Sequence, residues 1–411
     1  MTKQITIELT TMAHGGSALG RHEGRAVFVS YAIPGETVRA EITEDKGRYA
    51  FARTVEVLEP SPDRVEPPCP YFGPLKCGGC QWQHIAYPAQ RRFKREVLID
   101  QLTRIGKLED PVVQPTIAAP SEWEYRNRAK FHPAPNGELG FRSETGDRVV
   151  PIDVCLIVHP LLLELYRSLD LAMEDLKHLS LRVGTQTEDR MLIFEMEEDL
   201  PPAIEVDVAV SCVILLSDGV HANLIGDNVI TEIVGGQTYR ISAPAFFQVN
   251  TAQAETLVDQ ALTLLDPQPD EVVLDAFCGV GLFTTHLAER AATVIGIEEN
   301  HAAVEDLLEN TADYENVEVI EGPAEAALPD LDIPIDAALV DPPRGGVDRF
   351  ALDALLQRKP GRIVYVSCDP ATLARDIKRM ASSGYHPVKI QPVDMFPQTY
   401  HIESVTLLER R

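Results

Sequence analysis

This chain of 411 residues lacks the long apolar segments that mark membrane and secreted proteins. No stretch approaches the roughly 18 uncharged apolar residues that a membrane span needs. The first residues alternate polar and apolar side chains, without the apolar core of a signal peptide. We therefore expect a cytoplasmic protein in a reducing compartment, where its seven cysteines are metal ligands, nucleophiles or buried thiols and not disulfides.

Basic residues are also scarce, because 37 Lys and Arg face 63 Asp and Glu and the formal net charge is -26. Such a total speaks against a nucleic-acid partner. The deficit is unevenly distributed, since residues 1–150 carry 20 basic and 19 acidic residues while residues 151–411 carry 17 and 44. A polyanion would therefore meet the N-terminal part first, although solubility or salt adaptation explains the acidity equally well.

The N-terminal part, residues 1–60, shows the pattern of a small β-barrel. Short alternating strands are expected at residues 4–9, 25–31, 37–43 and 48–58, with glycine-containing turns between them. This pattern is typical of an oligonucleotide-binding (OB-like) barrel. Neither an internal repeat nor a low-complexity segment interrupts the chain.

The remainder divides into two further domains, which a chain of this length has room for. After a proline-rich linker, a central α+β domain at residues 61–235 holds four cysteines and most of the interleaved basic and aromatic residues. Residues 236–411 alternate apolar strands with helices, which predicts an α/β domain with a parallel sheet covered on both faces.

The C-terminal domain carries acidic residues where its strands end. Asp275-Ala-Phe-Cys-Gly-Val-Gly follows the first strand, and Glu298 ends the second, placed to accept hydrogen bonds from ribose hydroxyls. The turn lacks the third glycine that a pyrophosphate site would want. Asp341-Pro-Pro-Arg-Gly-Gly ends the fourth strand, where the alternative role for Asp341 is a helix cap or a turn. An acid-rich site of this kind suits S-adenosylmethionine, which is positive at sulfur and at its amino group.

Cys368 ends the fifth strand, in Ser367-Cys-Asp-Pro, just before an expected helix. The macrodipole at a helix N-terminus favours a thiolate, so this position predicts a nucleophile. An inert core thiol is the alternative for a lone cysteine.

Five motifs, in this order, resemble the RNA 5-methyluridine methyltransferase family over most of the chain. They are Phe246-Phe-Gln-Val-Asn, Asp275-Ala-Phe-Cys-Gly-Val-Gly, Asp341-Pro-Pro-Arg-Gly-Gly, Tyr365-Val-Ser-Cys-Asp-Pro-Ala-Thr-Leu-Ala-Arg-Asp and Asp394-Met-Phe-Pro-Gln-Thr-Tyr-His-Ile-Glu-Ser-Val. The N-terminal stretch Gly15-Gly-Ser-Ala-Leu-Gly-Arg likewise resembles a TRAM domain, a small RNA-binding barrel. The resemblance implies a Rossmann-like, S-adenosylmethionine-dependent methyltransferase domain behind a TRAM barrel.

The resemblance also implies roles for individual residues. The cofactor contacts would be Gln248, Phe277, Glu298 and Asp341. Cys368 would add to carbon 6 of uracil and so activate carbon 5 for methyl transfer, and Glu403 would then remove the carbon-5 proton. Arg344 is a weaker candidate for stabilising charge on the uracil oxygen. The target base must leave its stack to reach Cys368.

The four cysteines of the central domain show a metal-ligand spacing. Cys69, Cys77 and Cys80 lie close together, and Cys155 is the expected fourth ligand, because Cys212 lies in an apolar run that indicates buried core. On spacing alone, structural zinc fits equally well. Cys77-Gly-Gly-Cys-Gln-Trp-Gln-His resembles the iron-sulfur branch of the same family, which implies a 4Fe-4S cluster.

Two segments interleave cations with aromatic residues, as contacts with RNA require. Arg91-Arg-Phe-Lys-Arg is equally well explained as a solvated helix face, whereas Tyr125-Arg-Asn-Arg-Ala-Lys-Phe-His matches the family. We expect a monomer whose partner is RNA. Large-subunit (23S) ribosomal RNA is favoured, with transfer RNA (uridine 54) or a non-catalytic RNA-binding or chaperone role as the alternatives. Arg344 stands where a 5-methylcytosine enzyme would carry a second cysteine.

Overall fold

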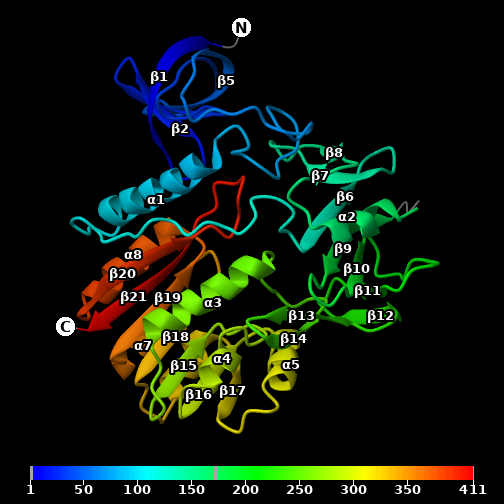
Figure 1. Ribbon diagram of the computed structural model, residues 1–411, viewed down its shortest axis with the longest axis vertical. Coiled ribbons are helices and arrows are strands. Elements are labelled where there is room, and N and C mark those ends of the chain that lie inside the picture. The colour runs from blue at the N-terminus through cyan, green and yellow to red at the C-terminus, as the bar shows by residue number, and fades with distance from the viewer. Residues whose placement is uncertain (1–2, 171–174, 411) are drawn as a thin grey trace.

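The computed structural model describes residues 3–170 and 175–410. Figure 1 shows a barrel at the N-terminal end, a sheet beside it from the middle of the chain, and a large helix-covered sheet from the C-terminal part. No helix within the described ranges is long and apolar enough to cross a membrane.

The N-terminal barrel is closed, with strands in the order β1-β2-β3-β5-β4 and β4 pairing back onto β1. Its strands are β1 (Gln4–Met12), β2 (Ala18–His22), β3 (Arg25–Ser30), β4 (Thr37–Asp45) and β5 (Tyr49–Glu59). Alternate residues point inward, so Ile7, Val29 and Ala50 share one core. Strand β2 has no counterpart in the predicted strands. A Cβ atom at Gly20 of β2 would lie 2.2 Å from the Glu8 carbonyl oxygen, so glycine permits the close approach of β1.

Helix α1 (Tyr87–Arg104) follows the linker and lies along the C-terminal domain, beside α8 (Figure 1). Pro88 is the second residue of the helix, in the first turn, where a missing N–H costs nothing. Leu98 and Leu102 pack into the core of the C-terminal domain. Part of the predicted central region is therefore bound to the catalytic sheet.

The central domain contains a seven-stranded sheet in the order β12-β11-β10-β9-β6-β7-β8, together with helix α2 (Pro160–Arg167). The strands are β6 (Arg128–Pro133), β7 (Leu139–Arg142), β8 (Val149–Pro151), β9 (Leu176–Val183), β10 (Arg190–Met196), β11 (Ser211–Leu215) and β12 (His221–Ile225). Stacked rings hold its core, since Phe131 lies 4.5 Å from Tyr166 and 4.9 Å from Phe141 between ring centroids.

The C-terminal domain is built on a second seven-stranded sheet, in the order β17-β16-β15-β18-β19-β21-β20. Its strands are β15 (Val272–Ala276), β16 (Thr293–Glu298), β17 (Val317–Glu321), β18 (Ala337–Val340), β19 (Arg362–Ser367), β20 (Tyr385–Val393) and β21 (Glu403–Arg410). Its helices are α3 (Thr251–Leu265), α4 (Thr284–Ala288), α5 (His301–Asn310), α6 (Ala324–Asp330), α7 (Arg349–Arg358) and α8 (Pro370–Ala381).

Helices cover both faces of this sheet, as the continuous apolar strands predict. Neighbouring residues of one strand point to opposite faces, so Val273 packs with α3, α4 and α5 while Leu274 packs with α6, α7, α8 and α1. The expectation of a wholly parallel sheet is wrong at one edge. Strand β21 runs antiparallel to both β19 and β20, and β20 was not predicted at all. This reversal brings the start of β21 to the edge where the parallel strands end.

The hairpin of β13 (Val229–Val234) and β14 (Gln237–Ser242) connects the two sheets. The expected boundary between residues 235 and 236 falls in the turn of this hairpin. Ile230 of β13 and Ile241 of β14 belong to the core of the C-terminal domain.

Candidate active site

The predicted site residues of the C-terminal domain gather at one edge of its sheet. Strand β18 lies between β15 and β19 and pairs with both. Phe277 follows β15, Asp341 follows β18 and Cys368 follows β19, so these three residues lie side by side at the end of the sheet. Ser367, the last residue of β19, pairs with Ser404 of the antiparallel β21. Cys368 directly follows Ser367 and Glu403 directly precedes Ser404, so both residues lie at this end of the ladder, where the charge of Glu403 acts on the Cys368 thiol.

The charges at this edge set the protonation of Cys368 and Glu403. Burial, followed by the charges of Glu403 and Asp341, raises the pKa of the Cys368 thiol to about 12. Burial and then Asp341 also raise the pKa of Glu403 well above its usual value, while Arg344 opposes both shifts. Burial and two carboxylates therefore outweigh the dipole of α8, which by itself favours the thiolate that the sequence predicts.

Three carboxylates beside this edge, those of Asp275, Glu298 and Asp341, have no ion-pair partner among the described residues. Asp275 is fully buried, and its Oδ2 atom accepts a hydrogen bond of 2.6 Å from Thr284, whereas its Oδ1 atom has no partner among the described residues. Burial raises the pKa of Asp275 to about 7, and burial with the charge of Asp275 does the same for Asp341. Glu298 accepts hydrogen bonds from the backbone N–H groups of Gly279 at 2.9 Å and Asn300 at 2.8 Å. This acidic lining fits a cationic ligand such as S-adenosylmethionine.

Phe277 lies on the turn after β15, and Gln248 lies on the loop before α3. Phe277 has a positive φ of 65°, and its N–H donates to the carbonyl of Ile297 at 2.9 Å, which fixes the turn after β15. Gln248 is 7% exposed in the loop before α3, where its carbonyl accepts a hydrogen bond from Asn127. Two residues later, Asn250 donates to the carbonyl of Met395. The Gln248 loop thus borders the segment that leads to Glu403.

Helix α1 holds that segment, residues 394–402, through buried polar contacts. Lys94 donates to Asp394 at 2.6 Å and to the carbonyl of Phe396 at 2.9 Å. Gln90 and Gln398 pair through two hydrogen bonds of 2.9 Å, one from each residue. The Gln398 carbonyl also accepts hydrogen bonds from the backbone N–H groups of residues 81 and 82, which follow Cys80. Residues 394–402, which precede Glu403, are therefore held both by α1 and by the loop that follows Cys80.

A loop of the barrel also reaches this edge. His14 lies 3.3 Å from the carboxylate of Asp369, the residue after the nucleophile candidate. The carbonyl of Gly16 accepts a hydrogen bond from the indole of Trp82, and Gly16 packs against Tyr400 so closely that a Cβ atom there would lie 2.8 Å from that side chain. The barrel is therefore packed directly against the catalytic edge.

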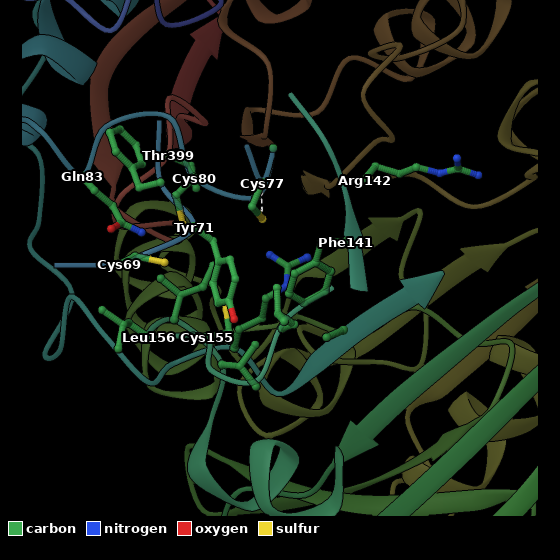
Figure 2. A pocket seen from close by; sticks show the side chains of 18 of the residues that line it. Cys69, Tyr71, Cys77, Cys80, Gln83, Phe141, Arg142, Cys155, Leu156 and Thr399 are labelled. Atoms are coloured by element: carbon green, nitrogen blue, oxygen red, sulfur yellow. Dashed lines mark hydrogen bonds between the residues drawn. The ribbon is translucent and has the colours of Figure 1, made fainter. Parts of the chain in front are cut away.

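The four cysteines predicted as ligands line a single cavity of about 380 Å³ (Figure 2). They come from two parts of the chain, Cys69, Cys77 and Cys80 from the linker region and Cys155 from the turn after β8. Within the described part of the chain, no three His, Cys, Asp or Glu side chains form a ligand group for a metal ion. Cys212 is fully buried in the core of the central domain, as expected.

The four thiols that line this cavity are compatible with a metal cluster, which is larger than a single metal ion. The four free thiols are soft ligands that face one space, and an iron-sulfur cluster spreads its thiolates more widely than one ion does. Burial raises the pKa of Cys155 to about 11, so these thiols would have to lose protons on binding a metal. Thr399 and His401 line the same cavity and belong to the segment that leads to Glu403.

The two segments that interleave cations with aromatic residues, residues 91–95 and 125–132, lie in different surroundings. In the first, at the start of α1, Lys94 is fully buried, Arg92 pairs with Asp63, and Arg95 donates to the carbonyl of Val113. Lys94 and Arg95 therefore serve the fold, whereas Arg92 remains on an exposed face of the helix. In the second, Arg126 lines the cysteine cavity.

Sequence reasoning missed several residues that the fold brings to this edge, among them His14, Gln90 and His401. Burial lowers the pKa of His401 to about 4, with the positive charge of Arg344 as the next cause, so this ring is neutral. The only signal in the sequence was the nearness of His401 to Glu403. His14 and Gln90 gave none, because their partners lie hundreds of residues away.

Comparison with known proteins adds two family matches. Residues 224–411 match the model of the tRNA (uracil-5-)-methyltransferase family, and residues 2–55 match the TRAM domain. The first match spans β13 to β21, including the edge described above, and the second spans most of the barrel.

Similar whole chains are also found among curated proteins. An uncharacterized RNA methyltransferase of Halalkalibacterium halodurans is 37% identical over 448 residues, covering 99% of this chain and 96% of that protein. One of Streptomyces avermitilis is 37% identical over 428 residues, covering 100% and 99%. Among solved structures, the Pyrococcus abyssi tRNA (uracil-54, C5)-methyltransferase in complex with S-adenosyl-L-homocysteine has a TM-score of 0.77 and 27% identity, covering 98% of this chain and 100% of that one.

Proposed function

This chain belongs to the tRNA (uracil-5-)-methyltransferase family with an N-terminal TRAM domain, and we propose that it forms 5-methyluridine in 23S ribosomal RNA through a covalent bond to Cys368. The family is one of S-adenosylmethionine-dependent RNA methyltransferases. The observation that carries the mechanism is that Cys368 follows β19 and Glu403 begins β21 at the same end of their shared ladder.

The thiol of Cys368 is proposed as the nucleophile. Carbon 5 of uracil is a weak nucleophile, and addition of the thiolate to carbon 6 turns it into an enolate equivalent that accepts a methyl group. Bound S-adenosylmethionine supplies that group on a positive sulfur. A positive charge in the cleft also offsets the carboxylates that raise the pKa of Cys368.

Glu403 is proposed as the base. After methyl transfer, carbon 5 still holds its proton, and the carbon–sulfur bond breaks only when that proton leaves. Glu403 is 4% exposed, and burial and Asp341 raise its pKa, which makes its carboxylate a better proton acceptor than an exposed one. Arg344, which opposes this shift, is proposed to stabilise charge on the uracil oxygen.

Two variants test this order of events. Cys368→Ala should form neither a covalent adduct nor product. Glu403→Gln should still allow addition and methyl transfer but not elimination, so a methylated enzyme–RNA adduct should accumulate and survive denaturing electrophoresis. The adduct should need S-adenosylmethionine. Normal turnover by Glu403→Gln would remove Glu403 as the base, and an adduct that persists in the double variant would remove Cys368 as the nucleophile.

Gln248, Phe277, Glu298 and Asp341 are proposed as the cofactor contacts. The support is the acidity of this edge, including the Oδ1 atom of Asp275, which has no hydrogen-bond partner within the described residues and suits the cationic centres of S-adenosylmethionine. Glu298→Gln should weaken binding of the cofactor measured by calorimetry, with the exposed Glu299→Gln as the matched control.

A 4Fe-4S cluster is proposed for the four-cysteine cavity, in a structural or RNA-positioning role, since methyl transfer needs no electron. Its support is the convergence of Cys69, Cys77, Cys80 and Cys155 on one space. Protein purified without oxygen should be brown and bind about four irons. Cys155→Ser should lose the metal and Cys212→Ser should keep it. Stoichiometric zinc without visible absorbance would support a structural zinc site instead.

Transfer RNA is the second candidate substrate, favoured by the likeness to the Pyrococcus abyssi tRNA (uracil-54, C5)-methyltransferase. Mapping 5-methyluridine in RNA from cells with and without this protein distinguishes the two, because the missing methyl group identifies the substrate. If no methyl group is lost, a non-catalytic RNA-binding role is favoured.

We also propose that the protein is a cytoplasmic monomer with three domains, at residues 1–60, 61–235 and 236–411.

A further inference from the structure

Gln398 has a hydrogen-bond partner for every polar group that it carries, although it lies in a loop. Its side-chain oxygen accepts from Gln90, its side-chain nitrogen donates to Glu122 at 3.0 Å, and its backbone N–H donates to Gln90. Its carbonyl accepts the backbone N–H groups of residues 81 and 82 at 3.1 and 3.0 Å. The residue is 2% exposed and is therefore too buried to contact a substrate.

The backbone at Gln398 has a conformation that residues other than glycine rarely adopt. Its φ is 68°, in the left-handed region. Such a residue stays there only where its surroundings compensate the strain. The hydrogen bonds of its N–H to Gln90 and of its carbonyl to residues 81 and 82 provide that compensation. The loop is therefore fixed in this conformation by contacts with α1 and with the loop that follows Cys80.

The short stretch from Gln398 to Glu403 is fixed as well. The hydroxyl of Thr399 accepts a hydrogen bond from the backbone N–H of His401 at 3.3 Å. Ile402, which directly precedes Glu403, is 3% exposed and packs in one core cluster with side chains of the barrel and of α1. A displacement of Gln398 is therefore passed on to Glu403 along a packed chain.

We propose that Gln398 is a positioning residue, which holds Glu403 at the end of the ladder of β19 and β21 by anchoring the preceding segment to α1. The inference rests on Glu403 being the base, as proposed above, and adds what keeps that base in place. A displacement of about 1 Å in a reacting group can lower a rate about 10²-fold. Glu403 acts only in the elimination, so a loosened segment should slow that step and not methyl transfer.

Methionine variants test this role, because methionine has nearly the length of glutamine but cannot donate or accept the amide hydrogen bonds. Gln398→Met and Gln90→Met each remove one side of the amide pair. Gln101→Met is the matched control, because Gln101 is a glutamine of the same helix, 3% exposed, whose amide donates to the neighbouring Asp100. An effect of a lost buried amide on stability alone would appear in all three variants.

The first measurement is the release of RNA from the methylated adduct. Each variant receives labelled S-adenosylmethionine and total RNA from cells that lack the protein, and the adduct is followed by denaturing electrophoresis. Release should be at least about tenfold slower in Gln398→Met and Gln90→Met than in the unchanged protein, with the same KM for S-adenosylmethionine. Gln101→Met should release RNA at the original rate. Unchanged release in both variants of the pair, or equally slow release in Gln101→Met, would overturn the proposal.

The second measurement needs no catalysis. Burial and then the charge of Glu403 raise the pKa of the Cys368 thiol, so displacement of Glu403 should speed alkylation of Cys368 by iodoacetamide, followed by mass spectrometry of its peptide. Gln398→Met should speed this alkylation but add nothing to the effect of Glu403→Gln, because both changes act through one carboxylate. Additive effects would overturn the proposal. If Glu403→Gln accumulates no adduct, the assignment of the base fails, while the alkylation rates still decide whether Gln398 positions Glu403.

Discussion

The buried ion pair of Lys94 and Asp394 joins α1 to the segment that leads to Glu403, and its removal tests how that segment is held. The side chains are 1% and 0% exposed, and the ammonium also donates to the carbonyl of Phe396 at 2.9 Å. Lys94→Met keeps the length and the apolar stem of the side chain while removing its charge. The variant therefore isolates the electrostatic part of the contact.

The expected loss is large, because Asp394 would keep a buried charge with no cation beside it. Its Oδ2 atom already has no hydrogen-bond partner among the described residues. Removing one member of a buried pair costs about 3–5 kcal/mol, whereas an exposed pair is worth at most about 1 kcal/mol. The double variant Lys94→Met/Asp394→Asn also removes the negative charge of Asp394. It should therefore regain most of the unfolding free energy that Lys94→Met loses.

Urea unfolding followed by tryptophan emission measures this effect. The chain has two tryptophans, and a Trp123→Phe background leaves Trp82, which is 1% exposed and packs 6.5 Å from the ring of Phe93 on α1. Its emission thus reports the docking of α1. A loss below about 1 kcal/mol for Lys94→Met, or a double variant no more stable than the single one, would refute the reasoning.

Three further predictions concern protonation and the barrel contact. With a pKa of about 12, only about one part in 10⁵ of Cys368 is thiolate at neutral pH, so alkylation by iodoacetamide should rise about tenfold per pH unit up to roughly pH 10. Glu403→Gln should speed alkylation by removing a negative neighbour, and a flat pH profile would contradict this account. Because the pKa of Asp275 is raised to about 7, affinity for S-adenosylmethionine in calorimetry should fall as the pH drops below that value and the carboxylate is protonated, and Asp275→Asn should reduce this dependence. His14→Ala should change the unfolding free energy by less than about 1 kcal/mol, because the partners of its ion pair are 35% and 26% exposed; a loss of several times that size would show that the barrel loop stabilises the catalytic edge.

The positions of the candidate site residues followed from local patterns. Runs of apolar residues predict strands, and glycine or proline after them predicts where those strands end. Asp341 and Cys368 were predicted to end the fourth and fifth strands along the chain, and parallel strands end at the same edge of a sheet. In the structure these two strands are β18 and β19, which pair with each other. The four cysteines were likewise predicted to converge, and they line one cavity.

Other features depended on partners that are distant in the sequence. Arg91-Arg-Phe-Lys-Arg has the composition of an exposed basic face, yet Lys94 is buried because Asp394 lies 300 residues away. Strand β20 was missed because it contains Pro387 and Pro392, and an edge position with β21 as its neighbour tolerates them.

The sequence by itself determined the barrel, the helix-covered sheet and the residues at its strand ends, because the periodicity and the turn residues behind those predictions are local. Only the tertiary structure decided the protonation of Cys368. The helix that follows it favours a thiolate, but burial and the carboxylates of Asp341 and Glu403, which arrive on two other strands, raise its pKa to about 12. Desolvation and long-range charge depend on what the whole fold packs around a group, and no local pattern contains that information.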